Sequence, residues 1–586
     1  MRQWMVAAKK ADFYVIAEKF HVDPVVARII RNREVIGEKN IRIYLGGNLS
    51  DLSDPHQMKD MDRLVEILAQ KIRKQVHIRI IGDYDVDGVT SSHLFLTALR
   101  RVGAKVDVII PHRIQDGYGL SLHLLQQAKE DGVDTILTCD NGIAAIDEIA
   151  WAKAQKMTVL VTDHHAVPFE EHEGRRTEKK SLADAVVNPH QQDCGYPYKE
   201  LCGAGVAWNV IRVLYENYDM DKREAEDLLD FVAMATVCDV MSLTGENRIL
   251  VKEGLKRIRH TKNIGLQALM QACNVQPENI SAYHFGYVLG PCVNATGRLD
   301  TARHALRLFE TGQETEAEEI ARDLVDLNQE RKELTLQGVE MAKKLCEEGG
   351  YENDPVLVLF LPDVHESIAG LIAGRIREMY NRPVFVLTRG EEGVKGSGRS
   401  TENYSMYENM CGCAELFTKF GGHPMAAGLS LPEENVEKFR RKINENCPLT
   451  VEEVCPDIHI DMAMPVGYAS TELVHQFALL EPFGKDNPSP LFADRNLSIS
   501  RMWVIGKNRN VLRMSVLSEY GQPVPVIFFG DVETLFAYFT EKFGQEEVEN
   551  ALHGRKNRIL FSMVYTAKID FYQGNENLQL EMKYYR

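Results

Sequence analysis

An apolar run that ends in three alternating carboxylates constrains the fold of this chain more than any other stretch. Residues 76–81 are rich in valine and isoleucine, Asp83, Asp85 and Asp87 follow, and residues 89–99 form a second apolar run. This order predicts a buried strand, a tight turn and a helix. Ligands of open α/β sheets bind at the carboxyl ends of the strands, so the carboxylates lie where a ligand is expected. Taken alone, the stretch is also compatible with a solvated acidic turn.

The same pattern recurs twice further along the chain. One short apolar run ends at Asp140, and another ends in Asp163, His164 and His165. Helical stretches separate the runs, and alternating strands and helices predict a parallel sheet with right-handed crossovers. Because the carboxyl ends of parallel strands meet at one edge of a sheet, all three polar clusters are expected to lie together there.

Carboxylates and imidazoles gathered at one sheet edge form a site for hard or borderline cations. Oxygen and nitrogen ligands suit Mn²⁺ or Mg²⁺ better than they suit a metal that prefers thiolates. Asp239, inside the apolar stretch 228–243, is a fourth candidate ligand. It either caps a turn or binds metal, and metal binding is favoured because a buried carboxylate without a partner is costly.

These motifs resemble the DHH phosphoesterase superfamily, and their details resemble the RecJ family within it. The four motifs of the superfamily are an Asp-x-Asp, a second Asp, an Asp-His-His triplet and a last Asp. The resemblance extends from Trp4 to the C-terminal end of the sequence, and the motifs together are highly specific. The matching stretches are Gly82–Gly88, Asp140–Gly142, Thr162–His165, Asp239–Leu243 with Glu246–Arg248, Asn294–Arg298, His365–Gly370, Gly396–Ser400 and Gly421–Gly428.

The resemblance implies an α/β fold class, with a parallel-sheet DHH domain and a smaller DHHA1 α/β domain joined by a long helix, plus a C-terminal β-barrel of the OB-fold type. A chain of 586 residues exceeds one hydrophobic core, so several domains are expected in any case. The expected domains are an N-terminal helical cap at 1–70, the DHH catalytic domain at 71–310, the connecting helix at 311–350, the DHHA1 substrate-binding domain at 351–450 and the OB-fold single-strand-binding domain at 451–586.

Periodicity supports two of these regions independently. Apolar residues near heptad spacing over 314–348 predict one helix of about 35 residues, which would span about 50 Å. It is expected to bridge two lobes, and a coiled-coil dimer helix is the alternative. Short β-rich runs after residue 455 predict the barrel, with a helical insertion near 532–543. Such barrels bind single strands through aromatic and basic residues, for which the candidates are Trp503, Lys507, Arg509, Arg513 and Lys556.

Several polar residues are expected to meet substrate phosphates. Arg113 lies beside a glycine-rich turn, where a surface arginine without a ligand is equally compatible. By resemblance to the family, Arg113 and Arg298 touch phosphate, and Arg298 is expected to do so from a loop. A Gly-Ser-Gly-Arg-Ser segment is compact and flexible enough for a phosphate-binding nest, in which Ser397 and Arg399 alternate as neighbours two apart on a strand would. His423 offers an imidazole beside two glycines. A cleft between the two lobes is the natural site.

The family resemblance implies phosphodiester hydrolysis assisted by two divalent ions. The catalytic residues would be Asp140, which bridges both ions, and His165, which faces the substrate as a hydrogen-bond donor. Asp85 would hold one ion, and Asp83 is a further candidate because Ile81 stands where related members often carry a histidine. The second ion would be held by Asp87, His164 and Asp239, with Asp163 either orienting an imidazole or binding metal directly.

The function implied by the resemblance is a single-stranded-DNA-specific 5′→3′ exonuclease of DNA repair and recombination that releases 5′-mononucleotides. The net charge of −17 instead favours a small phosphate substrate over DNA, although a focused basic groove is compatible with a negative total. The alternatives are therefore a phosphodiesterase for oligoribonucleotides or cyclic dinucleotides, and an inactive replication scaffold, which would typically have lost metal ligands.

Composition bounds the expected location and partners. The sequence has no signal peptide and no apolar run near 18 residues, so a cytoplasmic protein without a membrane partner is expected. Its eleven cysteines lack Cys-x-x-Cys spacing, which argues against a disulfide framework and a zinc finger. The expected partners are single-stranded DNA and, by resemblance, a single-strand-binding protein and a repair helicase. The expected oligomeric state is a monomer.

Overall fold

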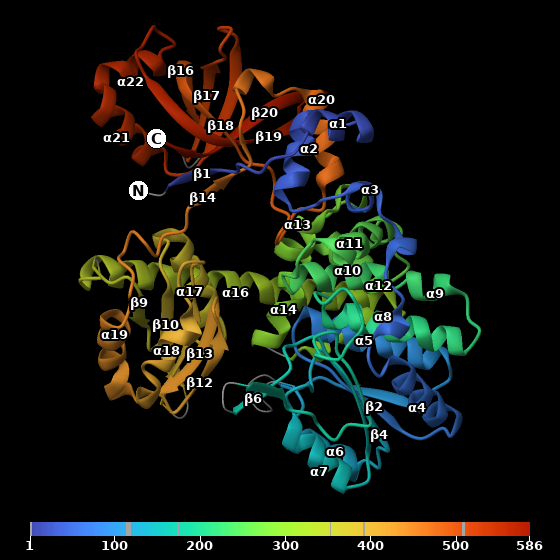
Figure 1. The fold of residues 1–586 in the computed structure, drawn as a ribbon. Coiled ribbons are helices and arrows are strands. Elements are labelled where there is room, and N and C mark those ends of the chain that lie inside the picture. The colour runs from blue at the N-terminus through green and yellow to red at the C-terminus, as the bar shows by residue number, and fades with distance from the viewer. Residues whose placement is uncertain are drawn as a thin grey trace. The chain divides into compact units, whose positions relative to one another are not determined.

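The chain forms two compact units, and each is built from segments that are distant in sequence. The computed structural model describes residues 3–112, 119–172, 175–299, 301–351, 353–390, 393–506, 510–572 and 574–586. The first unit contains residues 52–241 and 249–456, and the second contains residues 3–51, 242–248 and 457–586. Figure 1 gives the elements of both units.

The first unit is organised around a five-stranded sheet in which every neighbouring pair of strands is parallel. Its order is β3-β2-β4-β5-β8, so the predicted parallel α/β sheet is confirmed. The register places Ile81 opposite Thr138, and Cys139 opposite Thr162. The three strands with polar ends therefore finish at the same edge. The strands are β2 (Ile78–Ile81), β3 (Val106–Ile109), β4 (Thr135–Cys139), β5 (Thr158–Thr162) and β8 (Ala185–Val187).

Helices cover this sheet because its central strands are apolar on both faces. The helix that follows the first acidic turn, α5 (Val86–Arg101), is buried along most of its length. It packs against α8, α10 and α15 as well as the sheet. The other helices of this lobe are α4 (Met61–Arg73), α6 (Leu122–Glu130), α7 (Ile146–Ala154), α8 (Gly203–Asn217), α9 (Lys222–Glu226), α10 (Leu229–Cys238), α11 (Gly245–Ile258), α12 (Ile264–Ala272), α13 (Ala282–His284), α14 (Gly290–Leu299) and α15 (Arg303–Glu310), and a hairpin pairs β6 (Phe169–His172) with β7 (Arg175–Glu178).

One long helix, α16 (Glu314–Glu348), connects this lobe to the next, as predicted. Its 35 residues would span about 52 Å. Its first half packs on α12, α14 and α15 and its second half on α17 (Glu366–Tyr380). The apolar stripe of α16 therefore packs against other helices of the same chain, so it gives no reason to expect a coiled-coil dimer. Among the described residues, no helix has both the length and the hydrophobicity needed to cross a membrane.

The lobe that follows has a mixed five-stranded sheet of order β12-β13-β11-β10-β9. Residues 396–399 of the Gly-Ser-Gly-Arg-Ser segment lie in its strand β11, so the predicted nest is wrong, whereas the predicted alternation of Ser397 and Arg399 along a strand is confirmed. The reason is packing: a Cβ atom on Gly396 would lie 2.4 Å from Leu387, and one on Gly398 would lie 2.3 Å from Met406. The glycines thus press one strand face onto the core, and the other face presents the residues between them. The remaining elements are β9 (Leu357–Phe360), β10 (Val384–Gly390), β11 (Gly393–Arg399), β12 (Lys419–His423), β13 (Ala426–Leu431), α18 (Met406–Cys411) and α19 (Val436–Glu445).

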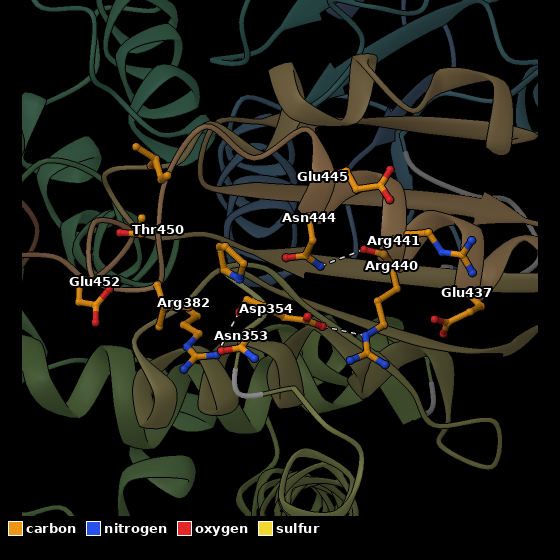
Figure 2. Close-up of a pocket in the computed structure, with 13 residues that line it drawn as sticks. Asn353, Asp354, Arg382, Glu437, Arg440, Arg441, Asn444, Glu445, Thr450 and Glu452 are labelled. Carbon is orange, nitrogen blue, oxygen red and sulfur yellow. Dashed lines mark hydrogen bonds and ion pairs between the residues drawn. The ribbon is translucent and has the colours of Figure 1, made fainter.

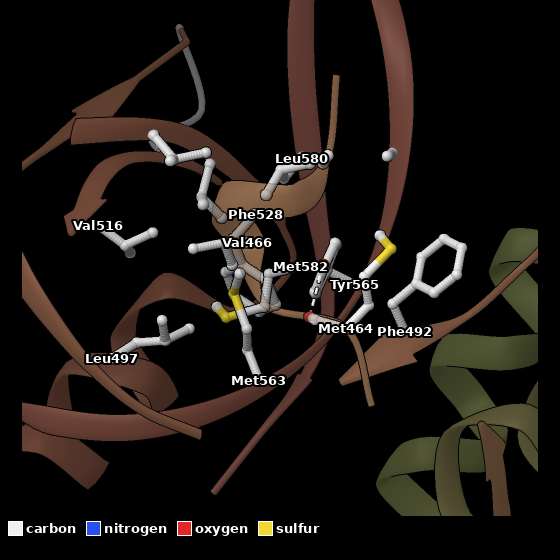
Figure 3. Packing of buried hydrophobic residues seen from close by; sticks show 14 of the residues in the cluster. Met464, Val466, Phe492, Leu497, Val516, Phe528, Met563, Tyr565, Leu580 and Met582 are labelled. Carbon is white, nitrogen blue, oxygen red and sulfur yellow. Dashed lines mark hydrogen bonds between the residues drawn. The ribbon is translucent and has the colours of Figure 1, made fainter. Parts of the chain in front are cut away.

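The second unit is a closed barrel, as the predicted OB fold requires. Its strands follow the order β15-β16-β17-β18-β20-β19, and a further pairing of β16 with β19 closes the ring. Figure 3 shows apolar side chains from several strands meeting inside it, with the Tyr565 hydroxyl donating to the Met464 carbonyl at 2.9 Å. The elements are β15 (Met462–Ala463), β16 (Phe492–Ile505), β17 (Val511–Leu517), β18 (Pro523–Phe529), β19 (Leu560–Tyr572), β20 (Asn575–Tyr585), α20 (Thr471–Phe477), α21 (Val532–Phe543) and α22 (Gln545–Leu552).

The N-terminal segment belongs to this barrel unit. Its buried side chains form one hydrophobic cluster with the barrel core, and Arg33 makes a bidentate pair with Asp461 at 2.7 and 3.1 Å. The expected cap at residues 1–70 is thus divided, because residues 3–51 join the barrel and α4 joins the first unit. The elements are β1 (Trp4–Val6), which pairs in parallel with β14 (Ile458–Ile460), α1 (Phe13–Phe20), α2 (Pro24–Asn32) and α3 (Glu38–Gly46).

Candidate active site

The turn between β2 and α5 fixes the first group of carboxylates. The Asp85 side chain caps α5 by accepting the Gly88 N–H at 3.0 Å. Gly88 is required here, because a Cβ atom would lie 2.4 Å from the Asp83 carbonyl oxygen. The Asn294 amide oxygen accepts the Val86 N–H at 3.2 Å and ties the turn to α14. The turn is therefore held on both sides, and its carboxylates have a fixed direction.

Asp87 points at the beginning of another helix. Its two oxygens accept the N–H groups of Gly203 at 2.6 Å and Ala204 at 2.7 Å, in the first turn of α8. Unpaired N–H groups and the helix dipole stabilise negative charge at this end. Both oxygens of the buried Asp87 side chain therefore have hydrogen-bond donors.

Asp140, at the end of β4, has a left-handed backbone with φ of 61°. Aspartate is among the few residues besides glycine that adopt this conformation readily. Gly203 leaves the room for it, because a Cβ atom there would lie 2.7 Å from the Asp140 Cβ. Asn141 supports the turn by donating to the carbonyls of Ile81 and Cys139 at 3.1 and 2.9 Å.

Asp163 holds the histidine pair in place. One of its oxygens accepts the N–H groups of His164 and His165 at 2.7 and 3.0 Å and the Nδ1 atom of His165 at 2.7 Å. Its other oxygen accepts the Ile143 N–H at 2.9 Å. Both oxygens are engaged, which favours the orienting role over direct metal binding of the two roles considered for Asp163.

The candidate ligands converge into overlapping groups. The Nε2 atom of His164 lies 3.1 Å from Asp140, 3.5 Å from Asp239 and 3.7 Å from Asp87. Within each group the ligand atoms lie within 4.8 Å of one another, as found among the described residues. Asp140 is shared between groups, which is the arrangement expected of a bridging ligand. The groups are Asp83, Asp85 and Asp140; Asp87, His164 and Asp239; and Asp140, His164 and His165.

The electrostatics of the cluster fit bound cations. Burial and the neighbouring Asp87 raise the pKa of Asp85, and burial and the surrounding carboxylates raise the pKa of Asp140 well above its usual range. Burial lowers the pKa of His164, whose buried Nε2 atom faces the carboxylates of Asp140, Asp239 and Asp87. Repelling carboxylates beside an unprotonated imidazole provide the oxygen and nitrogen donors of Mn²⁺ and Mg²⁺ sites.

His165 differs from His164 in charge and exposure. Burial lowers its pKa, but the Asp163 hydrogen bond, with the charges of Asp163, Asp239 and Asp87, raises the pKa to about 9. Its side chain is 41% exposed, whereas that of His164 is 9% exposed. Of the two imidazoles, His165 is therefore the one that can reach a substrate.

Asp239 lies at the end of α10, not inside a buried stretch as predicted, and its side chain is 26% exposed. Helix α10 is apolar over most of its length, and the apolar residues continue beyond it, so the sequence pattern did not mark its end. Val240 follows with φ of 55°, a conformation that costs a branched residue about 1–2 kcal/mol. Such strain persists only where surrounding structure imposes it, and here the turn directs Asp239 toward His164.

A second polar site is a pocket of about 470 Å³ in the same unit. Arg298 lines it from helix α14, so the prediction that Arg298 lies in a loop is wrong. Pro291 does not interrupt this helix, because proline is compatible with the first helical turn. The Arg298 guanidinium donates to the Ser367 carbonyl at 2.7 Å. The pocket is lined by Arg298, Glu366, Ser367, Ala369, Gly370, Thr388, Lys395, Gly396, Ser397, Arg399, Lys419, Phe420, Gly421, Gly428, Leu429 and Ser430.

Ser397 and Arg399 share the open face of β11 in this pocket. The Arg399 guanidinium donates to the Ser397 hydroxyl at 3.3 Å and to the Gly398 carbonyl at 2.7 Å. A Cβ atom on Gly370 would lie 2.8 Å from the Ser397 oxygen, so α17 approaches closely only because it has glycine there. The pocket thus combines cationic and hydroxyl donors, which suits an anion.

Some pocket residues escaped the sequence analysis, and some predicted ones are elsewhere. Lys395 continues the alternation of Ser397 and Arg399 and could have been found by it, whereas Lys419 arrives from β12 without a sequence signal. His423 is exposed at the end of β12 and is not among the lining residues. Arg113 lies outside the described residues.

A larger cavity of about 990 Å³ lies at the α19 side of the same lobe, and Figure 2 shows it. Two of its arginines are already engaged by groups of the same lobe. Arg382 donates to the carbonyls of Tyr351 and Asp354, both at 3.0 Å, and Arg440 donates to the Asp354 carboxylate at 2.7 Å. Because these groups bind one another, size alone does not make this cavity the active site.

The barrel presents aromatic and basic side chains on one outer strand face. Trp503 pairs with Arg513 across β16 and β17, and Arg501 lies 5.7 Å from the Trp503 ring centre. Lys568 lies 5.5 Å from the ring centre of Phe529, which is 52% exposed. Arg501, Phe529 and Lys568 were missed, because exposed residues on strands have no periodic signal of their own. Lys507 and Arg509 lie outside the described residues, and Lys556 is exposed.

Three family models match the chain. The DHH family N-terminal domain matches residues 77–236, the DHHA1 domain residues 353–447 and the RecJ OB domain residues 460–584.

Relatives of known name match over most of the chain. The single-stranded-DNA-specific exonuclease RecJ of Haemophilus influenzae is 32% identical over 582 residues, which are 96% of each chain. RecJ of Bacillus subtilis is 33% identical over 86% of this chain, which spans 63% of that protein's length. A crystal structure of RecJ from Thermus thermophilus in complex with Mn²⁺ superposes with a TM-score of 0.81 at 25% identity, covering 100% of this chain and 79% of the other.

Proposed function

The chain belongs to the RecJ family of single-stranded-DNA-specific exonucleases, and from this premise we propose that it hydrolyses single-stranded DNA from the 5′ end with two divalent metal ions, Mn²⁺ or Mg²⁺. The observation that supports the proposal best is the position of Asp140, which belongs to one ligand group with Asp83 and Asp85 and lies 3.1 Å from His164, a member of the group with Asp87 and Asp239. DNA repair and recombination are the processes in which such an activity would be used.

The proposed ligands divide between two ions. One ion would be held by Asp83, Asp85 and Asp140. The other ion would be held by Asp140 together with the group Asp87, His164 and Asp239. When bound, two such ions supply an activated water and neutralise the charge that develops on the phosphoryl oxygens. The hydrogen bonds from the N–H groups of Gly203 and Ala204 fix the direction of the Asp87 carboxylate for this role.

His165 is proposed to act on the substrate directly. Asp163 engages its Nδ1 atom, so Nε2 is the ring nitrogen that would face the phosphate. A raised pKa keeps the ring protonated near neutral pH, which lets it donate a hydrogen bond to a phosphoryl or leaving oxygen. Asp163 is then a positioning residue that fixes the ring.

The pocket on the second lobe is proposed to bind the 5′-phosphate. Arg298 and Arg399 provide positive charge, and Ser397 provides a hydroxyl donor. Arg113 is retained as a proposed phosphate contact by family resemblance, whereas His423, outside the pocket, is not. Binding the terminal phosphate there would select a strand end over an internal position.

The direction of digestion is the direct test of this function. With Mn²⁺ present, a single strand labelled at its 5′ end should release labelled mononucleotide at the first turnover, and a 3′ label should leave last. A duplex of the same sequence and an RNA strand are the controls, and EDTA should stop the reaction. Early loss of a 3′ label, or equal digestion of the duplex, would contradict the proposal.

The barrel separates an exonuclease from enzymes that act on small phosphodiesters. We expect Trp503→Ala combined with Arg513→Ala to raise KM on a strand of about 20 nucleotides by roughly tenfold or more, because base stacking and phosphate contacts are lost. The rate on a dinucleotide should not change, and the loss on the long strand should shrink at high salt. The measurement is KM against strand length.

Point variants are preferable to deletion of the barrel. Arg248 is buried in the barrel unit and donates to the carbonyls of Tyr44, Leu479 and Leu480 at 2.8 to 2.9 Å. Deletion would leave its charge without acceptors and unfold more than the barrel.

Tyr520→Ala, which removes an exposed ring at the turn after β17, is the matched control for the double variant. Parallel KM curves for the double variant and the control would leave the barrel as a protein-binding module, for which a single-strand-binding protein or a repair helicase is the proposed partner.

A further inference from the structure

We propose that Tyr283 and Tyr287 form a stacking platform for bases of the DNA strand on the 3′ side of the cleaved phosphate. Their rings are 5.1 Å apart at an angle of 23°, so they are stacked on each other. They are 62% and 71% exposed, which is unusual for aromatic side chains of this size. The inference rests on the proposed function and adds a binding subsite to it.

The two rings are neighbours because of the local helix geometry. A continuous helical run over residues 282–299 consists of α13, a π-helical turn at Phe285–Leu289 and α14. Residues four apart lie on one face of such a run, which brings Tyr283 and Tyr287 together. Phe285, between them, is fully buried and anchors the turn. π-Helical turns are rare and occur frequently at functional sites.

The adjoining face of the same run lies along the metal-binding loops. A Cβ atom on Gly286 would lie 3.5 Å from Val237, and one on Gly290 would lie 2.3 Å from the Cys238 sulfur. Further along, Asn294 accepts the Val86 N–H, and a Cβ atom on Gly297 would lie 2.4 Å from the Tyr84 carbonyl oxygen. Small residues thus let this run approach each loop in turn.

The tyrosines stand at the end of the run that adjoins Asp239. The Cys238 thiol donates to the Phe285 carbonyl at 3.3 Å, and Cys238 directly precedes Asp239. Val240, which follows Asp239, is 62% exposed and extends the apolar surface on this side. A strand whose phosphate is bound at Asp239 therefore has this surface beside its next bases.

The other end of the run gives the platform its place on the strand. Arg298 lies 13 positions after Phe285 and lines the proposed phosphate pocket, about 20 Å away at 1.5 Å per residue. With the 5′-phosphate at Arg298 and the ions between, the tyrosines meet nucleotides further in the 3′ direction. That distance corresponds to a few nucleotides, so a dinucleotide would not reach them.

The chemistry of the platform suits bases better than phosphates. Two phenol rings offer π-faces and no positive charge, and stacking on aromatic rings is tolerant of sequence because every base has a π-face. A chain with a net charge of −17 gains from holding DNA partly through uncharged contacts. An exonuclease must accept each successive sequence, and stacking meets that need.

The test combines tyrosine variants with abasic substrates. We expect Tyr283→Ala with Tyr287→Ala to raise KM on a strand of ten nucleotides by roughly tenfold or more, since each stacked base contributes about a five- to hundredfold effect. In the wild-type protein, a single abasic site moved along the strand should weaken binding at one or two positions. In the double variant the same abasic sites should have no further effect.

Controls separate failure of the platform from failure of the proposed function. The double variant should cleave a dinucleotide at the wild-type rate, and Tyr283→Phe with Tyr287→Phe should restore long-strand binding. Tyr14→Ala removes a ring that is 78% exposed on α1 and should change neither quantity. If an abasic site weakens binding equally in the wild type and the double variant, the platform is overturned. If the wild-type protein cleaves no dinucleotide, the proposed function is overturned instead.

Discussion

Replacing Asp140 by asparagine is expected to lower the exonuclease rate by about three orders of magnitude or more, because one carboxylate is proposed to serve both ions. Asparagine tolerates the left-handed backbone that Asp140 adopts, so the change removes charge without adding strain. The measurement is single-turnover cleavage of a 5′-labelled strand, together with metal affinity by calorimetry. The affinities for both ions should fall, since each of the two sites loses a ligand.

The thermal stability of the metal-free protein distinguishes a chemical effect from unfolding. Burial and the neighbouring carboxylates raise the pKa of Asp140, so its charge destabilises the folded state, and the asparagine variant should melt at the same or a higher temperature. Asp147→Asn, an acidic change in the first turn of α7, is the matched control and should retain full activity. Substantial turnover by Asp140→Asn at saturating Mn²⁺ would exclude the bridging role.

The second large effect is expected at the phosphate pocket. Arg399→Ala should weaken binding of 5′-phosphorylated strands by roughly 10- to 100-fold, because a charge-assisted hydrogen bond contributes about 1.5–3 kcal/mol. Binding of the same strand with a 5′-hydroxyl should change little. The informative quantity is the ratio of the two KM values, measured for the variant and the wild type.

Two further variants show whether the ratio reports the pocket. Lys419→Ala, on β12, which is separated from β11 by β13, should change the ratio in the same direction and by less, because its side chain is exposed. Arg389→Ala, on the same lobe, removes a pair with Glu433 outside the pocket and should leave the ratio unchanged. Equal losses on both substrates for Arg399→Ala would make Arg399 a general backbone contact.

The sequence predicted those parts of the fold and the site whose residues are close together in the chain. Strands that end in Asp140 or Asp163 are short apolar runs, and parallel pairing alone brings their ends to one edge. The long helix has a heptad pattern over its whole length. The fold class and the cation-binding chemistry follow from such local patterns.

Features that depend on packing between distant segments could not be predicted. The segment with Ser397 and Arg399 was predicted to form a nest because Gly396 and Gly398 suggest flexibility. In the structure, these glycines are required because a side chain at either position would clash with Leu387 or Met406. Lys419 reaches the pocket only through strand pairing. The spacing of Tyr283 and Tyr287 is visible in the sequence, but their exposure beside the Asp239 turn depends on how the helical run packs on α10.

The discontinuity of the barrel unit determines when the chain can finish folding during its synthesis. Residues 3–51 emerge from the ribosome roughly 400 residues before the barrel strands do, a delay of about 20–80 s at 5–20 residues per second. Until then the apolar face of α2, with Val25, Val26, Ile29 and Ile30, has no core to join and is open to association. The nascent chain is therefore expected to need shielding by a chaperone over this interval, although the DHH sheet can form much earlier. Premature termination within the barrel would leave that face exposed permanently, which makes shortened chains targets for proteolysis.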